Sequence, residues 1–274
     1  MTNKKEDLSS FRKKIDDIDI EIVGLLKKRM EIVKEVGHYK KQTSATQSFI
    51  RAGREATMLR NLVKEAKDTF PAEAIATMWR MIISTSLATE QEMSVSSYSS
   101  GQDKSCFWLA REYFGSFLKI TQQESADKVI KDVTAGNASV GVLPLQDNSD
   151  KPWWVRPGKE KNDVYIFARI PFVETEKSKV PSALAIANVM PEATNDDISI
   201  ISIHTTSPKE NIEKFFANEG LKINFIAVHN GKDYLVEINK FLHAGESAIE
   251  SIKKHLDKDS VIRFMGAYAT PIKL

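Results

Sequence analysis

The sequence predicts a multidomain fold: an all-α region of three helices at the N-terminus, followed by an α/β (α+β) region. The first part is predicted because apolar residues recur three and four positions apart, which is the period of an amphipathic helix. The second part is predicted because short β-branched runs alternate with helical stretches after residue 105. At 274 residues, the chain is long enough for two or three domains.

Composition excludes several classes of protein. The formal charge is +2, which does not suggest a broad nucleic-acid or membrane-surface face. Cys106 is the single cysteine and the five histidines lack metal-ligand spacing, so we expect no disulfide framework and no metal site. The N-terminus lacks the apolar core of a signal peptide, and no apolar run approaches membrane-spanning length. We therefore expect a soluble cytoplasmic protein without cofactor, nucleic-acid partner or membrane partner.

The first helix is predicted from Glu6 to about Lys41, with one apolar stripe along it. At about 1.5 Å per residue it is roughly 50 Å long, so a small domain of its own chain cannot cover the stripe. A partner helix is needed, most simply from a second copy of the chain, and we expect a homodimer. The residues of the stripe are Leu8, Phe11, Ile15, Ile18, Ile22, Leu25, Ile32 and Val36.

Arg29 stands where this stripe should carry an apolar residue, and Lys40 follows three turns later on nearly the same face. A guanidinium facing a helical core is costly unless an anion meets it. The alternatives to a ligand are an ion pair with a neighbouring helix or an arginine whose charged end reaches solvent.

The second and third helices also place polar groups on their inner faces. Helix two opens near Phe49 and runs to about Asp68, with Arg54 and Glu55 near its start; helix three begins at Pro71. The buried side of helix three continues by helical spacing through Ser86 and Glu90, where leucine or isoleucine would be expected. Ser86 could instead bond to its own helix, and Glu90 could turn into solvent.

Together these groups predict a cationic pocket suited to a small molecule with two carboxylates and hydroxyls. The sequence shows no Ser-His-Asp or Cys-His set, no phosphate loop and no metal cluster. A site that only positions and polarises its substrate fits a reaction without a nucleophile or a proton transfer.

The first 95 or so residues resemble the all-helical class of chorismate mutase. The charged positions recur at the spacing of that family across all three helices. The segments that carry the resemblance are Phe11–Asp19, Leu25–Arg29, Val36–Lys40, Arg54–Leu59 and Trp79–Ser86.

This resemblance implies an entwined helical dimer that rearranges chorismate to prephenate. It implies that Arg29 and Lys40 bind the carboxylates of chorismate, Lys40 also reaching the ether oxygen. Arg54 and Glu55 fall on the helix-two pair of the family, with Glu55 holding the ring hydroxyl, and Ser86 matches a further polar contact. The transition state loosens the ether bond and builds negative charge on its oxygen, so orientation and preorganised charge are the expected means of catalysis.

Arg12 matches the arginine that each chain of the family lends to its partner. Helix geometry agrees, because Arg12 is seventeen residues from Arg29 and about 100° off its face. Arg12 should therefore not serve the pocket of its own chain.

Two positions depart from the family pattern. Arg51 stands where many members have an acid, which either changes a hydroxyl contact or adds a ligand for a carboxylate. Glu90 stands where many members have glutamine. A carboxylate beside the ether oxygen opposes the developing charge, so Glu90 helps only when protonated, and we expect activity to fall as the pH rises.

The rest of the chain resembles a shortened prephenate dehydratase with its regulatory ACT module. The segments that carry this resemblance are Gly136–Asn148 and Phe264–Tyr268. From it we predict a mutase domain at 1–95, a linker at 96–105, a truncated dehydratase-like domain at 106–175 and an ACT-like domain at 176–274. The predicted strands and helices after the linker are 107–117 (helix), 124–133 (helix), 139–145, 164–170, 183–187, 198–203, 208–218 (helix), 223–228, 234–238, 247–256 (helix) and 261–265.

The dehydratase chemistry is not expected to survive. The Thr-Arg-Phe catalytic segment of that family is replaced by Tyr165-Ile166-Phe167, which removes the hydroxyl and the cation. Ala187–Met190 stands where an effector-binding motif would be expected, which leaves open the binding of an aromatic amino acid such as phenylalanine. We interpret Trp153 and Trp154 as buried anchors rather than a ligand-stacking pair.

The sequence therefore predicts a chorismate mutase with a regulatory or structural C-terminal half. Two alternatives remain: a bifunctional mutase and dehydratase, and a dimeric amino-acid sensor without catalysis. The polar set on the three helices disfavours the sensor, because a helix that only dimerises would carry leucine at position 29.

Overall fold

The computed structural model describes residues 7–42, 49–66, 68–147, 149–155, 164–174, 182–243 and 245–274. The chain divides into two compact units. The first unit comprises Met1–Phe49 and Ser86–Glu92, and the second comprises Ile50–Thr85 and Met93–Leu274. The predicted multidomain fold class is confirmed, since three helices precede a mixed α/β region.

The first unit is built on α1 (Leu8–Gln42), close to its predicted bounds. The Asp7 carboxylate accepts the backbone N–H of Ser10 at 2.9 Å, which caps the first turn of the helix. The helix then runs 35 residues without a proline, and Gly24 and Gly37 are tolerated inside it. Gln42, predicted to begin a polar connection, ends the helix, and residues 43–47 of that connection lie outside the described residues.

The apolar stripe of α1 is exposed in the single chain. Leu8, Leu25 and Ile32 are 66%, 64% and 60% exposed, and the rest of the stripe is also exposed. Gly37 is the one residue of α1 that is buried. A continuous exposed stripe of this size is typical of a surface that another chain covers.

Helices α2 (Ala52–Ala66) and α3 (Ala72–Glu90) match the predicted second and third helices. α2 lies in the second unit, whereas α3 is shared by both units. The buried residues of α2 include Leu59 and Val63. On α3, the apolar Met78 is exposed while the charged Arg80 is buried.

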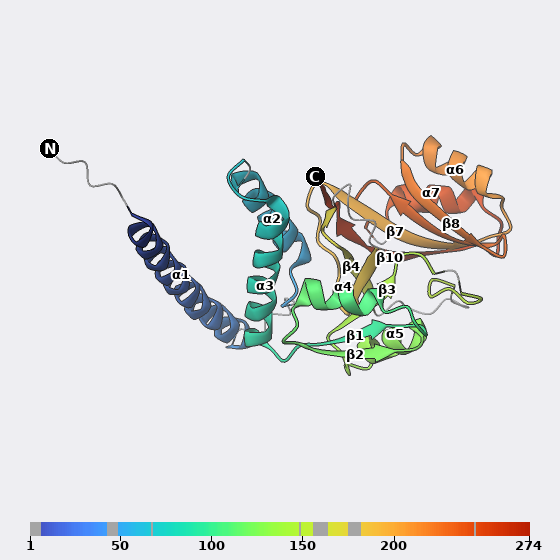
Figure 1. Cartoon of the computed structure of the whole chain (residues 1–274). Helices are drawn as coiled ribbons and strands as arrows, with labels where there is room; N and C mark the ends of the chain where they lie inside the picture. Colours follow the sequence, from blue (N-terminus) through green and yellow to red (C-terminus); the bar gives the residue numbers. More distant parts are fainter. Residues whose placement is uncertain are drawn as a thin grey trace. The chain divides into compact units, whose positions relative to one another are not determined.

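A nine-stranded mixed sheet forms the centre of the second unit (Figure 1). Its order is β2-β1-β3-β6-β4-β10-β7-β9-β8. The strands are β1 (Ser94–Tyr98), β2 (Lys119–Gln123), β3 (Val140–Pro144), β4 (Tyr165–Ile170), β6 (Ala183–Ala187), β7 (Asp197–His204), β8 (Ile223–His229), β9 (Asp233–Ile238) and β10 (Val261–Ala269). A separate pair joins β5 (Val173–Glu174) to β11 (Ile272–Lys273).

One end of the sheet is parallel. β1 pairs in parallel with both β2 and β3, and the connections pass through α4 (Ser105–Phe114) and α5 (Ala126–Thr134). The predicted linker at 96–105 is therefore wrong for its first residues, which belong to a central strand. The reason is that buried polar groups here have partners inside the protein: Ser96 donates to the Asp132 carboxylate at 2.8 Å.

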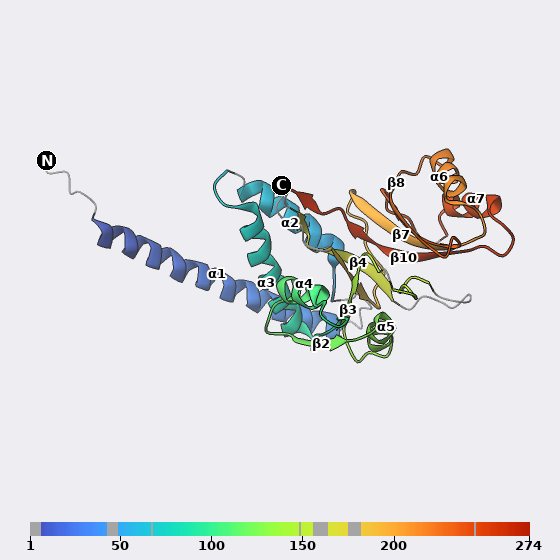
Figure 2. The same ribbon diagram turned by 45° about the vertical axis from the view of Figure 1, so that its right-hand side comes forward.

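The other end is antiparallel. β7, α6 (Lys209–Asn218), β8, β9, α7 (Ser247–His255) and β10 follow one another as a β-α-β-β-α-β unit. Helices α6 and α7 lie side by side against this part of the sheet (Figure 2). Ile212, Phe216 and Ile252 of the helices pack with Val236 and Ile238 of β9 in one apolar cluster.

The two predicted C-terminal modules share one sheet. β6, which we assigned to the ACT-like segment, pairs with β3 and β4 of the preceding segment. β10 in turn pairs with β4 at one position, where Gly266 faces Ile166. Gly266 has a φ of 136°, and a Cβ there would lie 2.8 Å from the Ile166 Cα. The backbones can approach so closely only because residue 266 has no side chain.

We predict that Gly266→Ala lowers the free energy of unfolding by more than about 3 kcal/mol, because the new methyl group meets backbone atoms that cannot move aside. Gly220→Ala is the matched control: its φ is also positive, at 68°, but nothing lies within 4 Å of a Cβ there. It should cost only about 1 kcal/mol of conformational strain. Urea denaturation measures both, and equal losses would contradict the close approach.

Candidate active site

The first unit brings together four of the residues that the sequence predicted for the site. The Arg29 Nη1 donates to the Ser86 Oγ at 2.5 Å. One helical turn further along α3, the Lys40 Nζ lies 3.2 Å from the Glu90 Oε2. Two cations of α1 thus lie beside a hydroxyl and a carboxylate at the end of α3.

The Lys40–Glu90 pair is largely removed from solvent. The side chains are 14% and 9% exposed, so Glu90 does not turn into solvent. Gly37 makes room for it: a Cβ at Gly37 would lie 3.3 Å from the Glu90 Cγ. The Lys40 ammonium also lies 4.9 Å from the centre of the Phe49 ring, within the range of a cation–π interaction.

Arg12 lies far from these pairs along α1. Seventeen residues of helix separate it from Arg29, which is about 26 Å along the axis. Its side chain is exposed. Arg12 therefore cannot reach the Arg29–Ser86 pair of its own chain, and its service to a partner chain stays a prediction.

The remaining predicted residues lie at the start of α2 in the second unit. The Glu55 carboxylate accepts the Arg80 Nη1 at 2.7 Å on one oxygen and the Arg51 backbone N–H at 3.4 Å on the other. Arg54 is exposed. The Arg51 side chain pairs with the Glu192 carboxylate at 2.6 Å, so a carboxylate of the protein itself engages that cation.

Sequence reasoning missed Arg80. It is buried on α3, and its guanidinium carbon lies 3.8 Å from the centre of the Tyr113 ring. The available signal was a charged residue inside the apolar run from Met78 to Ile83, the kind of position that is buried only with a partner.

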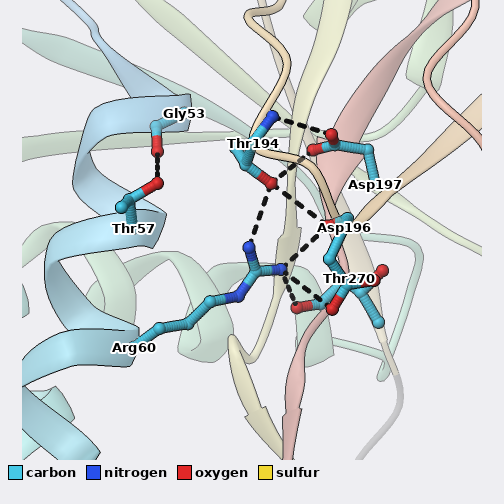
Figure 3. Close-up of polar contacts among 7 residues, drawn as sticks. All are labelled: Gly53, Thr57, Arg60, Thr194, Asp196, Asp197 and Thr270. Atoms are coloured by element: carbon cyan, nitrogen blue, oxygen red, sulfur yellow. Dashed lines mark hydrogen bonds and ion pairs between the residues drawn. The ribbon is translucent and has the colours of Figure 1, made fainter.

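Sequence reasoning also missed Arg60, which fastens α2 to the sheet (Figure 3). Its Nη1 donates to the Thr194 Oγ1 at 3.0 Å, and its Nη2 donates to the carbonyl oxygens of Asp196 and Thr270, each at 2.8 Å. Close by, Gly53 lets α2 approach the same loop, because a Cβ there would lie 3.0 Å from Glu192. Arg60 also lines a groove of about 580 Å³, which none of the predicted site residues lines.

The segment that replaces the dehydratase motif lies in β4. Ile166 and Phe167 are buried there, so their side chains fill the core. Trp153 and Trp154 are buried as predicted, and the Trp153 indole donates to the Pro144 carbonyl at 2.9 Å.

Ionisable groups do meet on the neighbouring strands. The Tyr268 hydroxyl donates to the buried Glu237 carboxylate at 2.7 Å, and Arg169 of β4 pairs with Glu174 at 2.9 Å. Burial raises the pKa of Glu237, although the hydrogen bond from Tyr268 and the charge of Arg169 act to lower it. This cluster is tied together by internal hydrogen bonds and ion pairs.

Groups suited to metal or covalent chemistry do not cluster in the part of the chain that the structure describes. No three His, Cys, Asp or Glu side chains there could hold a metal ion. Cys106 is buried, and burial raises the pKa of its thiol to about 12, so it is protonated at neutral pH. Among the same residues, no helix is long and apolar enough to cross a membrane.

Residues 11–91, which contain both pairs and the start of α2, match the family model of chorismate mutase type II. This part of the chain is similar to chorismate mutase type II domains. A bifunctional chorismate mutase/prephenate dehydratase of Pseudomonas aeruginosa is 28% identical over 149 residues, which is 53% of this chain and 40% of that protein. The enzyme of the same name from Aquifex aeolicus is 30% identical over 146 residues, or 52% of this chain and 40% of that protein. The chain spans about two fifths of the length of these curated relatives.

Solved structures show weaker similarity. Prephenate dehydratase from Streptococcus mutans has a TM-score of 0.44 at 12% identity. The matched region covers 66% of this chain and 100% of that protein's chain. A quorum quenching acylase, GqqA, has a TM-score of 0.45 at 9% identity, covering 66% of this chain and 96% of that one. Similarities at this level assign no function.

Proposed function

We propose that the chorismate mutase domain rearranges chorismate to prephenate. The observation that supports this most is the meeting of Arg29 with Ser86 and of Lys40 with Glu90 inside the span that matches the family. A [3,3] rearrangement forms one carbon–carbon bond and breaks one carbon–oxygen bond within a single molecule. It needs no nucleophile and no metal, only a held conformation and charge beside the ether oxygen.

The roles follow from charge and position. Arg29 and Lys40 bind the carboxylates of chorismate, and Lys40 also stabilises the negative charge that develops on the ether oxygen. Ser86 supplies a further hydrogen bond. Arg54 and Glu55 contribute from α2, with Glu55 accepting the ring hydroxyl, and Arg51 stays a candidate ligand whose cation is held by Glu192.

We further propose a homodimer in which the exposed stripe of α1 is covered by a second copy and Arg12 serves the partner. The exposure of the stripe supports this, since an uncovered apolar face of this length is unfavourable in water. The substrate and enzyme class indicate a cytoplasmic isomerase of aromatic amino-acid biosynthesis.

For the C-terminal half, we propose a regulatory or structural role, with an aromatic amino acid as the candidate effector. The burial of Ile166 and Phe167 supports it, because the segment that replaces the catalytic one contributes to the core. The second candidate is a bifunctional mutase and dehydratase, which the names of the curated relatives favour. A dimeric sensor without catalysis is the third, and the paired polar groups of α1 and α3 disfavour it.

Lys40→Ala tests the proposed function directly. We expect kcat/KM for chorismate to fall by about a hundredfold or more, because the charge beside the ether oxygen is lost. Lys41→Ala is the matched control, since Lys41 is the next residue and is exposed. It should keep turnover close to that of the wild type. Near-normal turnover by Lys40→Ala would contradict the role of Lys40.

Glu90→Gln tests the role of the second group. The Glu90 carboxylate lies 3.2 Å from the Lys40 ammonium, beside the proposed position of the ether oxygen. A carboxylate there opposes the developing negative charge, whereas an amide can donate a hydrogen bond to it. We therefore expect Glu90→Gln to raise kcat for chorismate at neutral pH, which steady-state rates measure. A kcat equal to that of the wild type would remove Glu90 from catalysis.

Ile18→Glu tests the dimer. A glutamate in the stripe should separate the chains in sedimentation measurements and abolish most turnover, since Arg12 of the partner is lost. Lys27→Glu is the control, because Lys27 lies on the opposite side of α1. It should leave the dimer and the rate unchanged. A dimer that survives Ile18→Glu would contradict the assigned interface.

A further inference from the structure

Arg80 is a buried cation held between two groups from different parts of the second unit. It is 5% exposed and carries its charge on the inner side of α3. On one side its Nη1 lies 2.7 Å from the Glu55 Oε2 of α2. On the other side its guanidinium lies against the ring of Tyr113, which belongs to α4. A charge this deeply buried persists only with such compensation.

The contact fixes the orientation of the Glu55 carboxylate. One oxygen accepts Arg80 and the other accepts the Arg51 backbone N–H, so both oxygens have assigned donors on separate elements. The Glu55 side chain is largely shielded from solvent beside Arg80. A carboxylate held at both oxygens has little freedom to turn, which is what a residue that must orient a substrate hydroxyl requires.

The C-terminal half supports Arg80. Tyr113 is buried in α4, and its backbone carbonyl accepts the Ser84 hydroxyl of α3 at 3.4 Å. α4 is therefore attached to α3 on the same face that carries Arg80. Burial disfavours the charged guanidinium, but Tyr113 and Glu55 beside it raise its pKa, so Arg80 stays charged.

We propose that Arg80 is a positioning residue of the mutase reaction, which holds Glu55 in the orientation that binds the ring hydroxyl, with Tyr113 as its support. Arg80 does not touch the substrate and acts through Glu55. The C-terminal half thereby takes part in shaping the mutase site. This inference rests on the proposed function.

A double-mutant cycle distinguishes positioning from general support of the fold. The variants are Arg80→Met, Glu55→Gln and the two combined, each measured for kcat and KM with chorismate. We expect Arg80→Met to lower kcat/KM at least about tenfold, mostly in kcat, in the wild-type background. In the Glu55→Gln background the same change should alter kcat/KM less than about twofold, because there is no carboxylate left to position. Equal losses in both backgrounds would overturn the proposal.

Arg80→Lys keeps the experiment decisive if Arg80→Met fails to fold. Lysine retains the charge for Glu55 but not the planar stacking on Tyr113. It should retain more activity than Arg80→Met and should also lose its effect in the Glu55→Gln background. An Arg80→Lys effect of the same size in both backgrounds would overturn the proposal.

Arg60→Met is the matched control. It removes three hydrogen bonds that attach α2 to the sheet, and their acceptors are Thr194, Asp196 and Thr270 rather than Glu55. It should lower the melting temperature and leave kcat/KM of the folded protein close to the wild-type value. A loss of kcat in Arg60→Met equal to that of Arg80→Met would overturn the specific role of Arg80. Absence of chorismate turnover in the wild type would overturn the proposed function and this inference together, whereas turnover with additive losses overturns this inference alone.

Discussion

A buried charge needs a partner, and the described part of the helical region supplies one of opposite charge at Lys40 and at Arg80. Lys40 meets Glu90 and Arg80 meets Glu55, whereas the half-buried Arg29 meets the neutral hydroxyl of Ser86. Burial of an ion costs several kcal/mol unless geometry and hydrogen bonds compensate it, so apolar replacements would stabilise such positions more simply. That the chain keeps polar pairs where leucine would pack is the strongest structural argument for a site that binds a charged ligand.

The same requirement explains how the second unit is held together. α2 belongs to the mutase family span but packs with the sheet, where Arg60 donates to three acceptors and Gly53 allows close approach. α3 is joined to α4 through Ser84 and Arg80. The family match at residues 11–91 therefore spans parts of both compact units, because α2 and most of α3 belong to the second unit. Substitutions in the C-terminal half should therefore change the packing of α2 and α3.

Much of this could be predicted from periodicity. The three helices and most C-terminal strands lie within a few residues of their predicted bounds, because apolar spacing records which face is buried. β1 was missed because serines fill it, and their burial depends on partners such as Asp132 that are far away in sequence. β2 was missed because it is polar and largely exposed. Arg80 was missed for a related reason: helical spacing places it on a face, but only the fold shows that Glu55 and Tyr113 meet it there.

The central claim is that the purified chain converts chorismate to prephenate and stops there. The most direct measurement follows the loss of chorismate absorbance and then assays the product for phenylpyruvate without adding acid. The account predicts that chorismate is consumed while prephenate accumulates. No consumption at any pH from acidic to mildly alkaline would contradict the mutase, and phenylpyruvate formed without acid would contradict the role given to the C-terminal half.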